Sequence, residues 1–150
     1  MAELHFETVI QRPIEDVFGL IADLPGYGKW LSPSNLYASV VHISDNPIKL
    51  GTKYVDSGKT TRMVGAVTVF EPPKRIHFRQ STTSLFGTLD VEAQYTLTST
   101  DDGTQVARHM VIRPSGGFQF LQGFLLGSIR KESERILAAM KVWLEKDAEG

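Results

Sequence analysis

The sequence contains no cysteine, which excludes a disulfide framework, a thiolate nucleophile and a cysteine-based zinc site. It also lacks an excess of charge of either sign, because 16 lysine and arginine residues are matched by 17 aspartate and glutamate residues. A protein without a net positive field does not attract phosphate backbones, so we expect no nucleic-acid partner. The absence of cysteine fits a reducing compartment, and we predict a cytoplasmic location.

Long apolar runs are missing too. No stretch approaches the ~20 apolar residues that span a bilayer, and residues 1–5 lack the basic and then apolar pattern of a signal peptide. We therefore expect no stable membrane insertion. Repeats and low-complexity tracts are also absent, and 41% hydrophobic with 22% charged residues is typical of one globular domain, here residues 1–150.

The N-terminal part of the sequence predicts a strand followed by short helices. Residues 4–10 alternate apolar and polar side chains, as in a strand with one solvated face. Pro13 suits the first turn of a helix, and Glu15 and Asp16 suit its positive end, so we predict a helix over about residues 13–22. One more short helical turn fits before Pro33.

From residue 37 onward the hydrophobic period changes to that of strands. Short turns separate the runs, so consecutive strands must be antiparallel. The predicted strands cover residues 37–43, 51–56, 60–70, 75–81, 86–98 and 104–112.

A long amphipathic helix is predicted from about residue 118 to residue 145. Seven antiparallel strands and one such helix pack economically when the sheet curls around the helix. We therefore predict an α+β helix-grip fold, with two short helices after the first strand. The apolar stripe of the long helix comprises Leu121, Leu125, Ile129, Ile136, Met140 and Leu144.

Three segments of the sequence resemble a known superfamily. They are residues 13–30 at the helical opening, residues 69–76 around a turn between strands, and residues 95–106 in the last hairpin. In this order they are similar to the START-like, or SRPBCC, superfamily, which includes START lipid-transfer domains, plant pollen-allergen proteins and polyketide cyclases. The resemblance implies an internal pocket for an apolar ligand.

Alternation along the strands predicts which side chains face that pocket, although each of them is equally compatible with an ordinary core position. Trp30 is added because the similar family position packs at the lid end of the pocket. The predicted apolar and aromatic ligand-binding residues are Phe6, Trp30, Tyr54, Met63, Val67, Phe78, Leu89, Tyr95, Met110, Leu125 and Ile129.

Two charged residues interrupt apolar patterns. Arg108 alternates with Val106 and Met110, and Glu132 lies at helical spacing within the stripe of the long helix. A charge in an apolar cavity needs a partner or a polar ligand group, so Arg108 and Glu132 are predicted to form the polar end of the pocket. The alternative is that a bulge turns Arg108 outward and that Glu132 reaches solvent at the mouth.

The sequence predicts no metal and no cofactor, because the four histidines show no metal-ligand spacing. Residues 57–60, Ser-Gly-Lys-Thr, imitate a phosphate-binding loop, but Lys53 stands where that motif needs glycine and a strand pattern follows. We predict a hairpin turn there. The resemblance implies that this turn and the loop over residues 81–86 act as flaps at the pocket mouth.

Three functions are compatible with this sequence. The first is a carrier or sensor that binds a small hydrophobic molecule, such as a lipid, an isoprenoid or a polyketide-like compound, as a monomer or weak dimer. The second is a polyketide cyclase or dehydratase, in which Arg108 would stabilise an enolate and Glu132 would act as acid or base. The third resembles the chaperone-regulator modules, and a large exposed apolar patch would favour it.

Overall fold

The computed structural model describes residues 1–59 and 61–149, and all described elements follow the predicted order of strand, short helices, strands and long helix. The elements are β1 (Ala2–Ile10), α1 (Ile14–Ala22), the 3-10 helix η1 (Leu24–Lys29), β2 (Ser39–Val41), β3 (Lys53–Ser57), β4 (Arg62–Glu71), β5 (Arg75–Ser84), β6 (Gly87–Thr100), β7 (Gly103–Gly116), the 3-10 helix η2 (Gly117–Leu121) and α2 (Gln122–Glu149).

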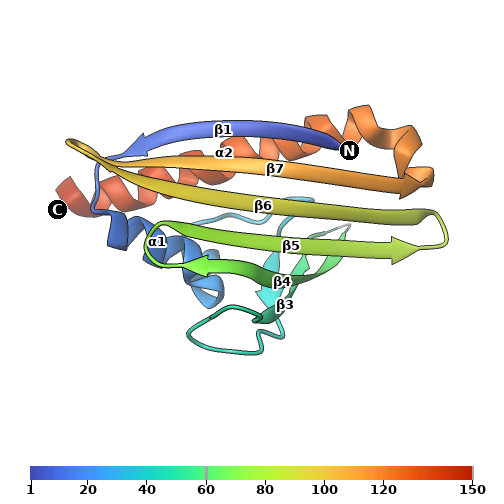
Figure 1. Ribbon diagram of the computed structural model, residues 1–150, viewed down its shortest axis with the longest axis horizontal. Coiled ribbons are helices and arrows are strands. Elements are labelled where there is room, and N and C mark those ends of the chain that lie inside the picture. Colours follow the sequence, from blue (N-terminus) through green and yellow to red (C-terminus); the bar gives the residue numbers. More distant parts are fainter. Residues whose placement is uncertain (60, 150) are drawn as a thin grey trace.

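The seven strands form one antiparallel sheet in the order β1-β7-β6-β5-β4-β3-β2. The first strand therefore lies beside the last, which brings the N-terminus next to the strand that leads into α2. Figure 1 shows α2 running behind β1 and β7, with α1 below the same end of the sheet as the C-terminus. The predicted helix-grip fold is confirmed.

The sheet separates an apolar concave face from a polar outer face, as its alternation predicts. Along β6, Leu89, Val91, Tyr95 and Leu97 are buried on the inner face. On the outer face, Arg79 pairs with Asp90 at 2.7 Å across neighbouring strands. This arrangement leaves only the inner face to be covered by helices.

The helix α2 packs closely against the sheet along only part of its length. Its C-terminal half buries Leu137, Met140 and Leu144, which join a core with α1 and η1. Its N-terminal half contributes only partly buried side chains, such as Leu125 and Ile129, to a second and smaller cluster. The looser half leaves space between helix and sheet.

Several predicted boundaries were wrong. Strand β5 ends at Ser84 and strand β6 begins at Gly87, so the predicted loop over residues 81–86 is only a two-residue turn. The alternation fades there because both faces of the hairpin tip are solvated. The predicted strand at 37–43 shrinks to the three residues of β2, and Leu121 of the predicted stripe is 42% exposed.

The Ser-Gly-Lys-Thr segment lies in the connection between adjacent antiparallel strands. Ser57 pairs with Arg62, and the amide of Gly58 donates to the carbonyl of Thr61 at 2.7 Å. The predicted hairpin turn is confirmed for this connection, although Thr60 lies outside the described residues. None of the described helices is both long and apolar enough to cross a membrane.

Replacing Met140 by alanine should lower the free energy of unfolding by about 2–5 kcal/mol, because the side chain is fully buried between α2 and the sheet. Urea denaturation followed by circular dichroism measures this change. Val142 on the same helix is 68% exposed, so Val142→Ala should change stability by no more than about 0.5 kcal/mol. Equal effects of the two substitutions would contradict the assigned packing of α2.

Candidate functional site

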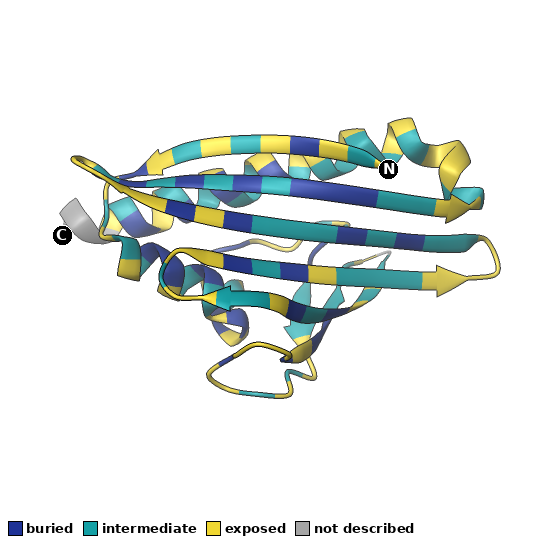
Figure 2. Cartoon of the chain, viewed as in Figure 1, coloured by how far each residue is buried: buried dark blue, intermediate teal, exposed yellow. Residues whose placement is uncertain are grey.

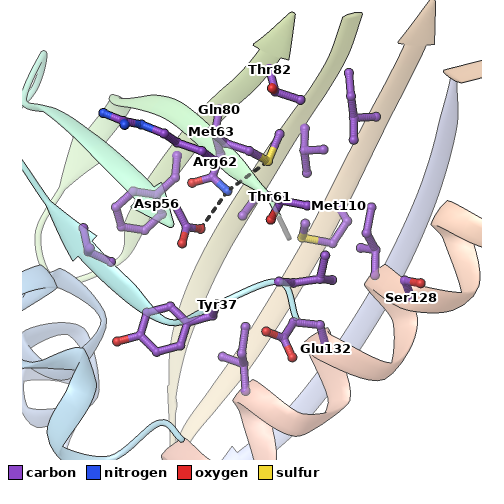
Figure 3. Close-up of a pocket in the computed structure, with 18 of the residues that line it drawn as sticks. Tyr37, Asp56, Thr61, Arg62, Met63, Gln80, Thr82, Met110, Ser128 and Glu132 are labelled. Carbon is purple, nitrogen blue, oxygen red and sulfur yellow. Dashed lines mark hydrogen bonds between the residues drawn. The ribbon is translucent and has the colours of Figure 1, made fainter. Parts of the chain in front are cut away.

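A cavity of about 370 Å³ occupies the space between the concave face of the sheet and the N-terminal half of α2. Strands β3 to β7 form one wall, α2 forms the other, and η1 with the segment that follows it closes the cavity toward the core. Figure 3 shows Asp56, Gln80 and Met63 across the space from Ser128 and Glu132 of α2. Most lining side chains are aliphatic or aromatic, so the cavity suits an apolar molecule.

Most of the residues predicted to face a pocket do line this cavity. They come from five different strands and from α2, which the topology brings together around one space. The predicted residues that line it are Tyr54, Met63, Phe78, Leu89, Tyr95, Arg108, Met110, Leu125, Ile129 and Glu132.

Three predicted residues lie elsewhere. Phe6 is on β1, the strand that α2 covers most closely, and it packs between the two core clusters. Val67 is buried in the core beside an irregularity in the pairing of β4 with β5. Trp30 packs behind Tyr27, with ring centroids 5.1 Å apart, so Tyr27 and not Trp30 reaches the cavity. For these three residues the prediction of cavity lining was wrong.

Arg108 points inward from β7, because β6 and β7 pair without a bulge. The pairing runs from Gly87 opposite Gly116 to Thr100 opposite Gly103. Arg108 is only 7% exposed. Its Nε donates to Ser133 Oγ at 3.1 Å, and its Nη1 donates to the hydroxyl of Tyr95, whose ring also lies 5.2 Å below the guanidinium carbon. In the part of the chain that the structure describes, no carboxylate oxygen lies within 4.0 Å of this guanidinium. Neutral groups therefore hold the positive charge.

Glu132 lines the cavity but is not the partner of Arg108. Its carboxylate accepts two hydrogen bonds from Arg135, at 2.7 and 3.0 Å, and a third from Ser34 Oγ at 2.9 Å. Arg135 also donates to the carbonyl of Ser32 at 2.7 Å. Arg108 and Glu132 both line the cavity but do not contact each other, because Glu132 instead ties α2 to the segment after η1.

A second polar group on the cavity wall was missed by the sequence analysis. The hydroxyl of Tyr54 donates to Gln80 Oε1 at 2.8 Å, and Gln80 Nε2 donates to Asp56 Oδ2 at 3.1 Å. The other carboxylate oxygen, Asp56 Oδ1, is buried and has no hydrogen-bond partner among the described residues. One acceptor at the wall of the cavity is therefore left without a partner among the described residues.

Gly65 leaves the space that the hydrogen bonds from Tyr54 to Gln80 and from Gln80 to Asp56 require; we call these two bonds the Tyr54–Gln80 relay. Gly65 lies on β4 between Tyr54 of β3 and Gln80 of β5 in the pairing register. A Cβ atom at Gly65 would collide with the Tyr54 ring. Because glycine leaves that space empty, the ring lies across β4 and its hydroxyl reaches the next strand.

The environment of Asp56 changes its acidity. Burial raises the pKa of Asp56 to about 6, and the nearby charge of Glu132 acts in the same direction, against the hydrogen bond from Gln80 and the charge of Arg108. Burial and the nearness of Asp56 likewise raise the pKa of the Tyr54 phenol. Asp56 therefore exchanges its proton near neutral pH while Tyr54 remains a donor, which is the condition that acid–base chemistry requires.

Among residues 1–59 and 61–149, no group of three or more histidine, aspartate or glutamate side chains is arranged to hold a metal ion.

Comparison with known proteins gives a family and a set of similar folds. Residues 1–145 match the family described as polyketide cyclase/dehydrase and lipid transport. No curated protein sequence matches. Protein MLL2253 from Mesorhizobium loti is 16% identical with a TM-score of 0.74, and the alignment covers 97% of this chain and 98% of that one.

Two further structures share the fold. The Aha1 dimer from Colwellia psychrerythraea is 16% identical with a TM-score of 0.71, with 97% of each chain covered. The di-domain ARO/CYC protein StfQ of the steffimycin biosynthetic pathway is 10% identical with a TM-score of 0.78 over 99% of this chain. The chain spans about half of StfQ, 52% of its length. At these identities the structures establish the fold alone.

The substitution Asp56→Asn should flatten the pH dependence of stability. Folded Asp56 has a pKa of about 6, against about 3.9 for an aspartate in an unfolded chain. Between those values the folded state holds more protons, so its stability falls as pH rises from about 4 to about 6, by roughly 2–3 kcal/mol at most.

Urea unfolding across that pH window measures the effect. Wild type should lose more stability than Asp56→Asn as pH rises, while Asp101→Asn, in the exposed turn between β6 and β7, should follow wild type. Parallel curves for wild type and Asp56→Asn would show that Asp56 is not buried as described.

Proposed function

The chain belongs to the polyketide cyclase/dehydrase and lipid transport family, and on that premise we propose that it binds a small, largely apolar molecule in its cavity as a carrier or sensor. The observation that supports this most directly is the cavity itself, about 370 Å³ in volume and lined mainly by aliphatic and aromatic side chains. Small-molecule sites typically fall between about 300 and 1,000 Å³.

The ligand of such a carrier should have at least one polar group. Arg108 makes hydrogen bonds to Ser133 and Tyr95 through two nitrogens, and a guanidinium has five N–H donors in all. A carbonyl or carboxylate oxygen is the group that suits the remaining donors. Asp56 Oδ1 in turn suits a hydroxyl donor. A plain hydrocarbon would leave the remaining donors of Arg108 and the second oxygen of Asp56 without partners in an apolar space, which costs free energy.

Filling the cavity should abolish binding without unfolding the protein. Ala93 faces the cavity between Phe78 and Met110 of the neighbouring strands, so Ala93→Phe should lower affinity for Nile red at least about tenfold. Fluorescence titration measures this, and native mass spectrometry of the purified wild type reports any co-purified molecule. Thr96→Phe places the same ring on the outer face of β6 and should bind as wild type does. Equal loss in both variants would contradict a binding site in the cavity.

A second candidate function is catalysis by a cyclase or dehydratase, and the presence of both Asp56 and Arg108 on the wall of one cavity favours it. A carboxyl with a pKa of about 6 is suited to accept and return a proton near neutral pH. The guanidinium of Arg108 is suited to stabilise the enolate that proton removal creates. In this proposal Asp56 replaces Glu132 as acid or base, because Arg135 and Ser34 already occupy the carboxylate of Glu132.

The enzyme proposal is tested with a linear poly-β-ketone thioester, with ring closure followed by liquid chromatography. Wild type should accelerate closure over buffer, and Asp56→Asn and Arg108→Met should each lower the rate by about a hundredfold. Arg79→Met, on the outer face beside Asp90, should leave the rate unchanged. A wild-type rate equal to that in buffer would exclude catalysis on this substrate class and favour the carrier.

A further inference from the structure

One end of the molecule exposes large apolar side chains that neither the core nor the cavity uses. Leu85 and Phe86 form the turn between β5 and β6, and Phe120, Leu121 and Phe124 follow at the start of the helical segment. Leu85 is fully exposed, Phe120 is 90% exposed and Phe124 is 73% exposed. Figures 1 and 2 show the β5–β6 turn and η2 at the same end of the sheet, away from the C-terminus. We call these five residues the apolar end.

The apolar end is held in place by specific contacts. The ring of Phe86 lies 5.0 Å from that of Phe118, edge to face, and the amide of Gly117 donates to the carbonyl of Phe86 at 2.6 Å. Phe120 and Phe124 are four residues apart, which places them on one side of the helical segment. Exposed phenylalanine and leucine side chains gathered this way mark an interaction surface.

The acidic residues nearest to the apolar end in the sequence, Asp90 and Glu132, are already paired with Arg79 and Arg135. From residue 103 to residue 131 the sequence contains no aspartate or glutamate, and residues 81–89 contain no charged residue at all. The exposed cations Arg130 and Lys131 lie on α2 six and seven residues beyond Phe124, and the exposed Glu134 follows them. The surface therefore combines apolar rings with a flanking positive charge.

We propose that the apolar end docks the protein onto the surface of a lipid bilayer that contains anionic lipids. Aromatic and leucine side chains insert at the boundary between headgroups and acyl chains, and nearby lysine and arginine side chains attract anionic headgroups. The contact is peripheral, since no described helix is suited to span a bilayer. It stands independently of whether the cavity holds a ligand.

A second copy of this chain fits the same surface less well. In a symmetric dimer the same patch meets itself, so Arg130 and Lys131 of both copies would gather around one interface. On this part of α2 Glu132 is already paired with Arg135, so one exposed carboxylate, Glu134, stands against the two cations in each copy. An anionic lipid surface supplies the missing negative charge.

Flotation with vesicles tests the proposal. The protein should bind vesicles of phosphatidylcholine mixed with phosphatidylserine, bind pure phosphatidylcholine vesicles more weakly, and lose binding as salt is raised. The double substitution Phe120→Ser with Phe124→Ser should lower partitioning at least about tenfold. Both side chains are exposed, so the variant should fold as wild type does. Val142→Ser, at the opposite end of α2, is the matched control and should bind as wild type does.

Two flotation results and one sedimentation result would overturn the proposal. Wild type that does not float with anionic vesicles, or a double variant that floats as well as wild type, excludes lipid docking through these residues. Sedimentation as a dimer that the double substitution makes monomeric, without vesicle binding, assigns the apolar end to a second copy. Nile red affinity of the double variant should equal that of wild type, so a failure of cavity binding is distinguished from a failure of docking.

Discussion

The structure depends on one mismatch, between a long curved sheet and a helix that can pack closely against only part of it. The C-terminal half of α2 forms the core with α1 and η1, where Met140 is fully buried. Its N-terminal half stands off from β5, β6 and β7, whose strands extend beyond the packed region. Close packing at one end and separation at the other produce a stable domain and a cavity in a single layer arrangement.

Two kinds of polar group interrupt the apolar wall of that cavity. Arg108 donates hydrogen bonds to neutral hydroxyl groups on β6 and α2. Asp56 keeps one oxygen paired through the Tyr54–Gln80 relay, which glycine at position 65 makes room for. Because neither group forms an ion pair within the protein's described residues, the cavity presents a donor and an acceptor that are not cancelled by each other.

The sequence predicted the fold well because alternation and helical spacing are averaged over many residues. The same alternation placed Arg108 on the inner face, since β7 is regular over its whole length. Helical spacing placed Glu132 toward the cavity but could not identify its partners, which are Arg135 one turn away and Ser34 from a distant segment. Asp56 was not singled out at the end of its predicted strand, although it shares the inward parity of Tyr54. Contacts between distant segments decide such cases, and no local pattern records them.

Phe118 has a position that joins the interior of the molecule to its outside. Its ring lines the cavity and also packs edge to face against Phe86 of the exposed turn. A displacement of that turn therefore acts on the cavity wall through this ring contact. Under the proposed function, a surface that touches the turn would in this way act on the wall around a bound molecule.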